Sequence, residues 1–327
     1  MTMVRRQFLH LAASVAMLPA MSRFGLAQAY PSRQITMIVP YPPGGPADVV
    51  GRIVAERMRA ALGQPIIIEN VGGADGSIAI GRAARAKADG YTIALGTSST
   101  QVLNGALYSL PYDVLNDFAP VSPLATNPMV IFARPNLARD LNELIAWLKA
   151  NPNRASAGIG ASAAHLVAVL FQRETGTQFT LVPYRNSNSA IQDLMADQID
   201  IVFATPDRLA LMRAGSIKAY AVTSDARSPG VDIPTFHELG LPSVSFINWY
   251  GLFAPKSTPK DIIRKLRSSI EGALADPAVR SRLADPGLRF SVVNNNHWRR
   301  SESWRGLVLR NGGRSSKVRY QPREQPC

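Results

Sequence analysis

The stretch VPYPPGGPADVV, residues 39–50, joins a predicted β-strand to a predicted α-helix. The residues at 35–40 read as a strand, and apolar side chains recur at helical spacing over 47–63. The Pro-Pro-Gly-Gly loop between them carries no acid, base or nucleophile. Glycine lets a ligand approach the backbone, proline keeps the loop rigid, and a helix start offers unpaired N–H groups. The stretch therefore predicts a rigid backbone cradle for an anion such as a carboxylate, with a simple tight turn as the alternative.

Short apolar runs continue to alternate with helical patterns on both sides of this junction. Strands are predicted at 35–40, 65–70 and 91–96, with helices at 47–63 and 77–90. A second block repeats the alternation over 128–224, and a return segment at 246–259 precedes two further helices. This order predicts an α/β protein of two lobes, each with a parallel sheet covered on both faces, whose chain crosses between the lobes more than once.

Six predicted strand-to-helix junctions share a composition rich in Gly, Ser, Thr and Asn. In open α/β sheets, ligands bind beyond the carboxyl ends of the strands, where these junctions lie. The GGADG segment lacks the spacing of a dinucleotide fingerprint and has no P-loop Gly-Lys-Ser/Thr after it, so nucleotide binding is disfavoured. The junctions read PYPPGGPAD, ENVGGADGS, GTSSTQ, GIGASAAH, PYRNSNS and ATPD.

Composition excludes several classes of protein. The net charge of +13 is concentrated at the ends, because residues 30–288 carry only +3. A mildly basic body does not indicate a nucleic-acid-binding protein. The single cysteine is Cys327, and the sequence has no HExxH, CxxC or EF-hand pattern. We therefore expect no disulfide framework, no metal site and no cofactor.

The first 29 residues have the features of an export signal. Arg5-Arg6 precedes Phe8-Leu9 and an apolar run, and Ala27-Gln28-Ala29 provides a small-x-small cleavage site. We expect a twin-arginine signal peptide that is removed near Ala29, which places the mature chain in the periplasm. A membrane anchor is the alternative, but the apolar run is shorter than the roughly 20 residues that a span requires.

Two further features have competing interpretations. Ser162 and His165 lie one helical turn apart, which allows a nucleophile and a base, although no oriented acid partner is evident. A hydrogen-bonding role for His165 on the helix face or in a pocket is the other interpretation. Trp249 and Tyr250 either line a cleft or pack at the boundary between the lobes.

Several segments together resemble the Bug-type (TctC-like) extracytoplasmic solute receptors of tripartite tricarboxylate transporters. They include YPSRQITMIVPYPPGGPADVVGRIVAE, GQPIIIENVGGADGSIAIG, VPYRNSNSAIQDLMADQIDIVFA and WYGLFAPKSTP, and the likeness covers about residues 30–288. The resemblance implies a type II periplasmic-binding-protein fold that closes on a small organic carboxylate without converting it. It implies that the chain is not an enzyme, that its partners are the ligand and two membrane permease subunits, and that it is a monomer.

The resemblance also implies lobe boundaries and ligand-binding residues. Lobe 1 is expected at 30–128 and 250–288 and lobe 2 at 129–249. The basic tail at 289–327 departs from the family pattern, and two interpretations are open: an aberrant, frameshifted C-terminus, or a genuine basic extension that contacts a membrane or a partner. The implied ligand contacts in lobe 1 are Pro42, Pro43, Gly44, Gly45, Asp48, Gly73, Ala74, Asp75, Gly76, Ser77, Thr97, Ser98 and Thr100. Those in lobe 2 are Gly160, Ala161, Ser162, His165, Tyr184, Asn186, Ala204, Thr205 and Asp207.

The sequence departs from the family pattern in the second loop. The family usually has Asn-Arg-Pro-Gly-Ala-Gly-Gly where this chain has Asn-Val-Gly-Gly-Ala-Asp-Gly, residues 70–76. Asp75 in that loop would repel an anionic group or recognise an ammonium group, and Asn186 and Ala204 also differ from the usual residues. We therefore expect a carboxylate ligand, such as a di- or tricarboxylate, an aromatic acid or an amino acid, without naming one. A ligand-sensing subunit for a membrane kinase and an exported hydrolase are the alternative functions.

Overall fold

The computed structural model describes residues 30–227 and 232–284. Every helix and strand named below belongs to the compact unit that spans Arg33–Cys327. The predicted signal peptide and the predicted atypical tail lie outside the described residues, so both stay predictions.

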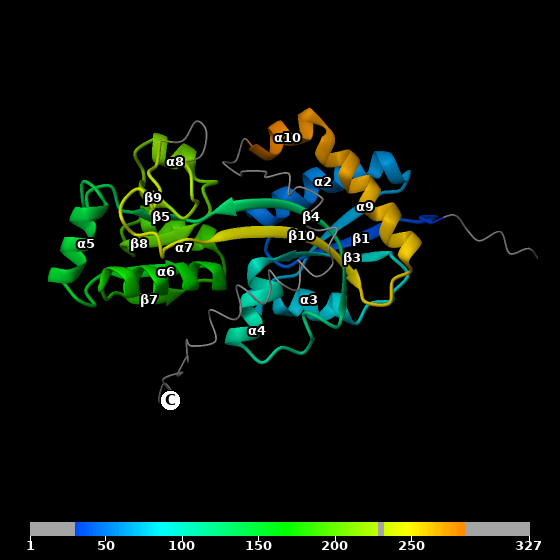
Figure 1. Ribbon diagram of the computed structural model, residues 1–327, viewed down its shortest axis with the longest axis horizontal. Helices are drawn as coiled ribbons and strands as arrows, with labels where there is room; N and C mark the ends of the chain where they lie inside the picture. The colour runs from blue at the N-terminus through cyan, green and yellow to red at the C-terminus, as the bar shows by residue number, and fades with distance from the viewer. Residues whose placement is uncertain (1–29, 228–231, 285–327) are drawn as a thin grey trace, which may run out of the picture. The chain divides into compact units, whose positions relative to one another are not determined.

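The described chain forms two five-stranded sheets (Figure 1). The first has the order β2-β1-β3-β10-β4 and the second the order β7-β6-β8-β5-β9. We call each sheet with its helices a lobe. The strands of lobe 1 are β1 (Ile35–Val39), β2 (Ile66–Asn70), β3 (Thr92–Thr97), β4 (Phe118–Pro128) and β10 (Ile247–Pro255); those of lobe 2 are β5 (Val130–Ala133), β6 (Ser156–Ile159), β7 (Thr180–Pro183), β8 (Ile201–Ala204) and β9 (Lys218–Val222).

Each sheet is mixed, which corrects the prediction of parallel sheets. In lobe 1, β1 pairs in parallel with β2 and β3, whereas β10 is antiparallel to both β3 and β4. In lobe 2, β6 is parallel to β7 and β8, whereas β5 is antiparallel to β8 and β9. A continuous apolar run shows that a strand is buried on both faces but does not reveal the direction of its neighbours.

The helices cover both faces of the first sheet. Helices α2 and α9 lie on one face and α3 on the other (Figure 1). Their bounds and those of the remaining helices are α2 (Pro46–Leu62), η1 (Ala74–Gly76), α3 (Ser77–Ala84), η2 (Ser99–Leu103), α4 (Asn104–Leu107), α5 (Leu141–Ala150), α6 (Ser162–Thr175), α7 (Ser187–Met195), α8 (Leu209–Arg213), α9 (Lys260–Ala275) and α10 (Pro277–Ala284).

Two strands connect the lobes. Met129 alone separates β4 from β5, and β10 enters the first sheet after the chain leaves β9 in the second. The chain thus passes between the sheets twice, as the alternation of elements and the return segment predict. The positions of the lobe boundaries stay a prediction.

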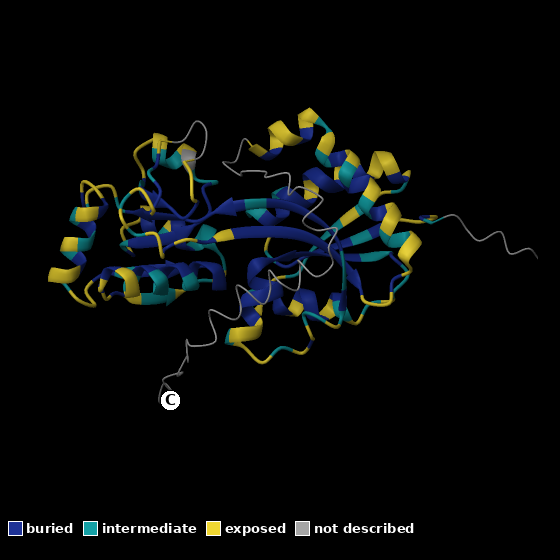
Figure 2. Ribbon diagram, viewed as in Figure 1, coloured by how far each residue is buried: buried dark blue, intermediate teal, exposed yellow. Residues whose placement is uncertain are grey.

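Buried residues follow the strands of both sheets and the helix faces turned toward them (Figure 2), and most of these residues are apolar. In lobe 2, the ring of Phe171 lies 5.9–6.3 Å, between centroids, from those of Phe179, Phe203 and Phe236. The rings of Phe179 and Phe203 stack at 6.2 Å. In lobe 1, Trp249 is buried and packs against Phe253 at 6.3 Å. Of the two open interpretations for Trp249, the structure favours packing. These cores fix the strand ends from which the cleft is built.

Candidate functional site

The loop between β1 and α2 is held in shape by Asp48. The Asp48 carboxylate accepts hydrogen bonds from Gly44 N–H, Arg52 Nε and Asn70 Nδ2, each at 2.9 Å. Gly44 has φ +80°, a left-handed conformation that favours glycine. Burial alone would raise the pKa of Asp48, but its hydrogen-bond donors outweigh burial and lower the pKa below its ordinary value. Asp48 therefore stabilises the conformation of the loop through these hydrogen bonds. It lines neither of the two cavities at the site.

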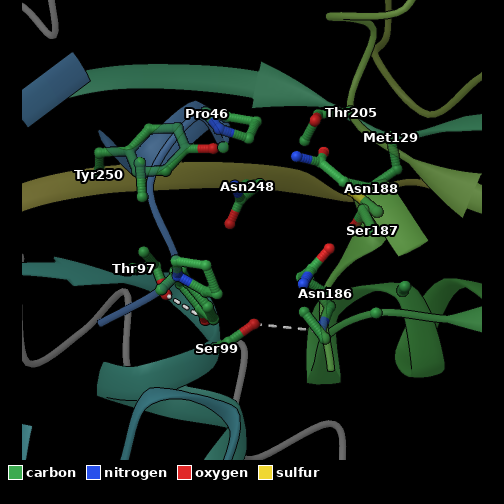
Figure 3. A pocket seen from close by; sticks show the side chains of 18 residues that line it. Pro46, Thr97, Ser99, Met129, Asn186, Ser187, Asn188, Thr205, Asn248 and Tyr250 are labelled. Carbon is green, nitrogen blue, oxygen red and sulfur yellow. Dashed lines mark hydrogen bonds between the residues drawn. The ribbon is translucent and has the colours of Figure 1, made fainter. Parts of the chain in front are cut away.

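A cavity of about 90 Å³ lies between the lobes at this loop. That is room for several water molecules or one small organic molecule. Its wall combines residues of both lobes, and none of them carries a charged side chain. The lining residues are Tyr41, Pro42, Gly45, Pro46, Ala47, Thr97, Ser99, Met129, Gly160, Ala161, Ala163, Ala164, Asn186, Ser187, Asn188, Thr205, Asn248 and Tyr250 (Figure 3).

Two helices begin at the wall of this first cavity with free backbone donors. Pro46 occupies the first position of α2, so the first N–H of that helix is that of Ala47. At α7, the Asn186 side chain caps the helix by accepting from Ser189 N–H at 3.0 Å. Among the residues that the structure describes, no acceptor then bonds to the N–H groups of Ser187 and Asn188. Both helix starts thus present N–H groups and a partial positive charge toward the cavity.

Neutral hydroxyl and amide groups complete the polar lining. Tyr250 accepts from Asn127 Nδ2 at 3.3 Å, and burial raises the pKa of the Tyr250 phenol, so its proton remains available for donation. Asn248 lies between Ser98 and Asn127 and bonds to both. Figure 3 shows Tyr250 and Asn248 of β10 across the cavity from Asn186, which caps α7, and from Ser187 and Asn188 in its first turn. The arrangement can hold an oxygen-rich solute through donors that carry no net charge.

Asp207 lies behind this wall and positions two of its members. Thr205 Oγ1 donates to Asp207 Oδ1 at 2.6 Å, and Arg208 forms an ion pair with Asp207 at 3.0 Å. Arg208 also donates to Asn188 Oδ1. Burial raises the pKa of Asp207, although Arg208 and Thr205 act in the opposite direction. The ion pair of Asp207 and Arg208 thus orients Thr205 and Asn188 from outside the cavity.

A second, larger cavity of about 930 Å³ adjoins the first. The two share Tyr41, Pro42, Gly160 and Ala161 in their linings. The remaining lining residues of the second cavity are Pro40, Gly72, Gly73, Ala74, Asp75, Gly76, Leu107, Tyr108, Ile159, Ser162, His165, Leu181, Pro183, Tyr184 and Arg185.

Lobe 1 binds the N-terminus of α6 through three side chains. Asp75 Oδ2 accepts from Ser162 N–H at 2.8 Å, and Ser99 Oγ accepts from Ala163 N–H at 3.2 Å. Asn104 Oδ1 accepts from the Ser162 hydroxyl at 2.8 Å. Burial raises the pKa of Asp75, while its hydrogen bonds with Ser162 and Tyr41 lower it. The start of α6 is thus already occupied, unlike those of α2 and α7.

The comparisons with known proteins agree with this architecture. The family model described as "Tripartite tricarboxylate transporter family receptor" matches residues 50–301, which is more than half of the chain. The protein BugT of Bordetella pertussis is 36% identical over 300 residues, covering 88% of this chain and 92% of BugT. The chain belongs to this receptor family. The resemblance inferred from its sequence is therefore confirmed.

Solved structures give the same result for the fold of this receptor. The periplasmic binding protein BugD is 32% identical with a TM-score of 0.81, covering 88% of this chain and 97% of BugD. MatC of Rhodopseudomonas palustris, solved with bound malate, is also 32% identical with a TM-score of 0.81, covering 88% of this chain and 99% of MatC. The predicted two-lobed α/β fold is confirmed, and so is the prediction that the chain is a solute-binding protein and not an enzyme.

Ser162 and His165 do not form a hydrogen-bonded nucleophile and base in this receptor. The Ser162 hydroxyl donates to Asn104, and within residues 30–227 and 232–284 no hydrogen bond joins it to His165. Burial lowers the pKa of His165 and favours its neutral form, which is the form of a general base, so the geometry and not the charge of His165 speaks against this pair. The same residues contain no group of three His, Cys, Asp or Glu side chains that could hold a metal ion. Among the helices they form, none is both long and apolar enough to span a bilayer.

The structure brings most of the predicted ligand contacts to the two cavities. Pro42, Gly45, Thr97, Gly160, Ala161, Asn186 and Thr205 line the first cavity. Gly73, Ala74, Asp75, Gly76, Ser162, His165 and Tyr184 line only the second. The remaining predicted contacts lie in neither lining: Pro43, Gly44, Asp48, Ser77, Ser98, Thr100, Ala204 and Asp207. Which of them touch a ligand stays a prediction.

Sequence reasoning did not select Tyr41, Ser99, Asn188 and Asn248 of the first cavity. Tyr41 stands inside the Pro-rich loop, Ser99 in GTSST, and Asn188 in PYRNSNS, so their junctions gave the signal. Asn248 had none, because it lies within a β-strand and not at a junction. Tyr250, for which two interpretations were open, lines the cavity.

Proposed function

We propose that this receptor captures a small organic carboxylate in the first cavity, in the periplasm, and presents it to the permease subunits of a tripartite transporter. The observation that carries the proposal is the wall of that cavity, where the starts of α2 and α7 present free N–H groups among neutral hydroxyls and amides. Helix N-termini bind carboxylates through such N–H groups and their partial positive charge.

The neutral lining favours reversible capture. A charged side chain would add attraction, but it would also have to be desolvated when the cleft closes on the ligand. Backbone N–H groups and hydroxyls are already oriented by the fold, so little reorganisation accompanies binding. Family membership and the malate bound to MatC support an organic acid as the solute.

The ligand class can be tested by a thermal-shift screen followed by calorimetric titration. The panel contains mono- and dicarboxylates, amino acids, neutral sugars and nucleotides. Ligand at 100 times its dissociation constant adds about 2.7 kcal/mol to the free energy of unfolding. We expect shifts with organic acids and none with sugars or nucleotides. A receptor that ignores every carboxylate would contradict the proposal.

The backbone cradle is tested by Gly45→Val. Gly45 lines the first cavity, and a Cβ placed there would meet only Pro42 O, at 3.7 Å, so the fold tolerates a side chain. The added methyl groups would fill the space beside the α2 N-terminus, and we expect every carboxylate hit to weaken at least tenfold in calorimetry. Gly272→Ala in α9, where a Cβ has open space around it, is the control with unchanged binding.

Delivery to a permease is tested in membranes. Vesicles that contain the two permease subunits of a tripartite transporter should accumulate the labelled hit only when the receptor is added. Uptake that does not depend on the receptor would leave a binding protein without the proposed transport role.

A further inference from the structure

The Asp75 carboxylate belongs to lobe 1 but makes its shortest hydrogen bond to lobe 2. Its Oδ2 accepts from Ser162 N–H at 2.8 Å, and its Oδ1 accepts from the Tyr41 hydroxyl at 3.3 Å. Asp75 has φ +47° and ψ +43°, a left-handed conformation that Asp and Asn adopt more readily than most residues. The Asp75 carboxylate therefore already accepts the hydrogen bond of the first N–H group of α6, that of Ser162.

The contact lies at the boundary of the two cavities. Tyr41, which donates to Asp75, lines both cavities, whereas Asp75 and Ser162 line only the second. An elongated ligand that starts in the first cavity would extend across this boundary. Its far end would then reach the Ser162 N–H group, which Asp75 already occupies.

A second ligand carboxylate would therefore find no free donor at α6. Ser162 N–H is taken by Asp75 and Ala163 N–H by Ser99. Within residues 30–227 and 232–284, no acceptor bonds to the N–H groups of Ala47 in α2 or of Ser187 and Asn188 in α7. It would also lie beside the Asp75 carboxylate, and two carboxylates at one buried site repel each other.

We propose that Asp75 selects the ligand class of this receptor by holding the position of a second carboxylate, so that acids with one carboxylate bind and acids with two are rejected. The inference rests on the proposed capture of a carboxylate in the first cavity. In this proposal Asp75 excludes dicarboxylates, and it does not contact the preferred monocarboxylate.

Matched pairs of ligands and two variants test the assignment. Calorimetry compares butyrate with succinate and hexanoate with adipate. In the unmodified receptor, each monocarboxylate should bind at least tenfold more tightly than its paired dicarboxylate. Asp75→Gly suits the left-handed backbone and frees Ser162 N–H, and we expect it to reduce that ratio at least tenfold. Asp75→Asn keeps an acceptor at Ser162 but removes the charge, and we expect a smaller reduction.

The matched control is Asp197→Gly. Asp197 also has a positive φ, of +55°, but its side chain is 71% exposed and lines neither cavity. This variant should keep the ligand ratio of the unmodified receptor. Circular dichroism and thermal melting verify that each variant is folded, and Asp75→Asn decides the test if Asp75→Gly does not fold.

The possible outcomes separate the two proposals. A receptor that binds carboxylates but prefers the dicarboxylate of each pair overturns the assignment to Asp75. So does an unchanged ratio in a folded Asp75→Gly variant. If no variant binds any carboxylate, the proposed function fails and the assignment fails with it.

Discussion

Asp48 shows how a buried carboxylate can serve the site without facing the ligand. Its side chain is only 4% exposed, and both of its oxygens accept hydrogen bonds, from Gly44 N–H, Arg52 and Asn70. Arg52 is half exposed, so the ion pair itself contributes little to stability. The hydrogen bonds from Gly44 and Asn70 are the larger contribution, because they join the loop, the helix and β2.

Asp48→Asn should destabilise the receptor. The amide can accept from only one of the two donors, Gly44 and Asn70, and we expect a loss of about 1.5–3 kcal/mol in the free energy of unfolding at pH 7. Urea denaturation measures the loss. Asp261→Asn, at an exposed position in the first turn of α9, is the control and should stay within about 0.5 kcal/mol of the unmodified receptor.

The pH dependence of that difference follows from the direction of the pKa shift. Folding lowers the pKa of Asp48 below its ordinary value of 3.8. The folded state then binds the proton less readily than the unfolded state, so the stabilisation is complete above that value. It is lost as the pH falls through the lower, folded pKa. The gap between the receptor and Asp48→Asn should therefore stay constant from pH 7 to 5, and a gap that vanished in that range would contradict this role.

The sequence alone identified the two loops that contain Asp48 and Asp75, but it did not identify the residues to which these aspartates bond. Asp48 bonds to Asn70 and Asp75 to Ser162, across 22 and 87 positions of the chain. Glycine and proline make a junction visible because they act on the local backbone. Which junction lies against which depends on packing between the lobes, and no local pattern contains that information.

At the scale of elements, the start of α7 is positioned by close contact with the end of β6. A Cβ added at Gly160 would lie 2.4 Å from Ser187 N and 2.6 Å from Asn186 C. Both of these are backbone atoms, which cannot rotate away as a flexible side chain would. Glycine at 160 is thus required for the α7 N-terminus to reach the first cavity.

Gly160→Ala should displace α7 and weaken binding. Overpacking against backbone destabilises by about 1–3 kcal/mol. The displaced N–H groups of Ser187 and Asn188 would no longer face the ligand, so we expect the dissociation constant of a carboxylate hit to rise at least tenfold. Calorimetry and urea denaturation measure the two effects. Gly105→Ala in α4, whose Cβ would meet only Leu110 Cδ1 at 3.8 Å, should change neither; full binding by a stable Gly160→Ala variant would refute this reading.

Elements with a strong hydrophobic period could be predicted, and those without one could not. The predicted helix at 47–63 differs from α2 by one residue at each end. The predicted helix at 77–90 ends instead at Ala84, because residues 85–90 offer no large apolar side chain for packing. Strand β4 was missed, since its three prolines and its Ser, Thr and Asn residues hide its apolar positions.

For the whole molecule, closure of the cleft depends on contacts that do not involve a ligand. The lobes are connected by the paired strands β4 and β10, which allow hinge motion at the points where the chain passes between the sheets. Asp75, Ser99 and Asn104 of lobe 1 accept hydrogen bonds from the first turn of α6 in lobe 2. These bonds stabilise the closed arrangement before a solute arrives.

Removing these contacts should open the ligand-free receptor. Ser99→Ala removes the acceptor of Ala163 N–H, and Asn104→Ala removes the acceptor of the Ser162 hydroxyl. Because Asn104 also bonds to Ser77 within lobe 1, Ser99→Ala is the cleaner change for the size of the ligand-free receptor, although Ser99 lines the first cavity. By small-angle X-ray scattering, we expect a larger radius of gyration in the ligand-free double variant. A saturating carboxylate should return it to the value of the unmodified receptor.

The single variant Asn104→Ala should also bind more weakly, and it removes no lining side chain, because Asn104 lines neither cavity whereas Ser99 lines the first. If the closed population falls tenfold, the apparent dissociation constant rises tenfold. A double control, Asn116→Ala with Ser245→Ala, changes the same residue types at exposed positions and should alter neither size nor affinity. Equal radii for the ligand-free receptor and the Ser99→Ala, Asn104→Ala variant would show that closure does not depend on the bonds of Ser99 and Asn104 to α6, which leaves the Asp75 bond to Ser162 N–H as the contact of α6 with lobe 1.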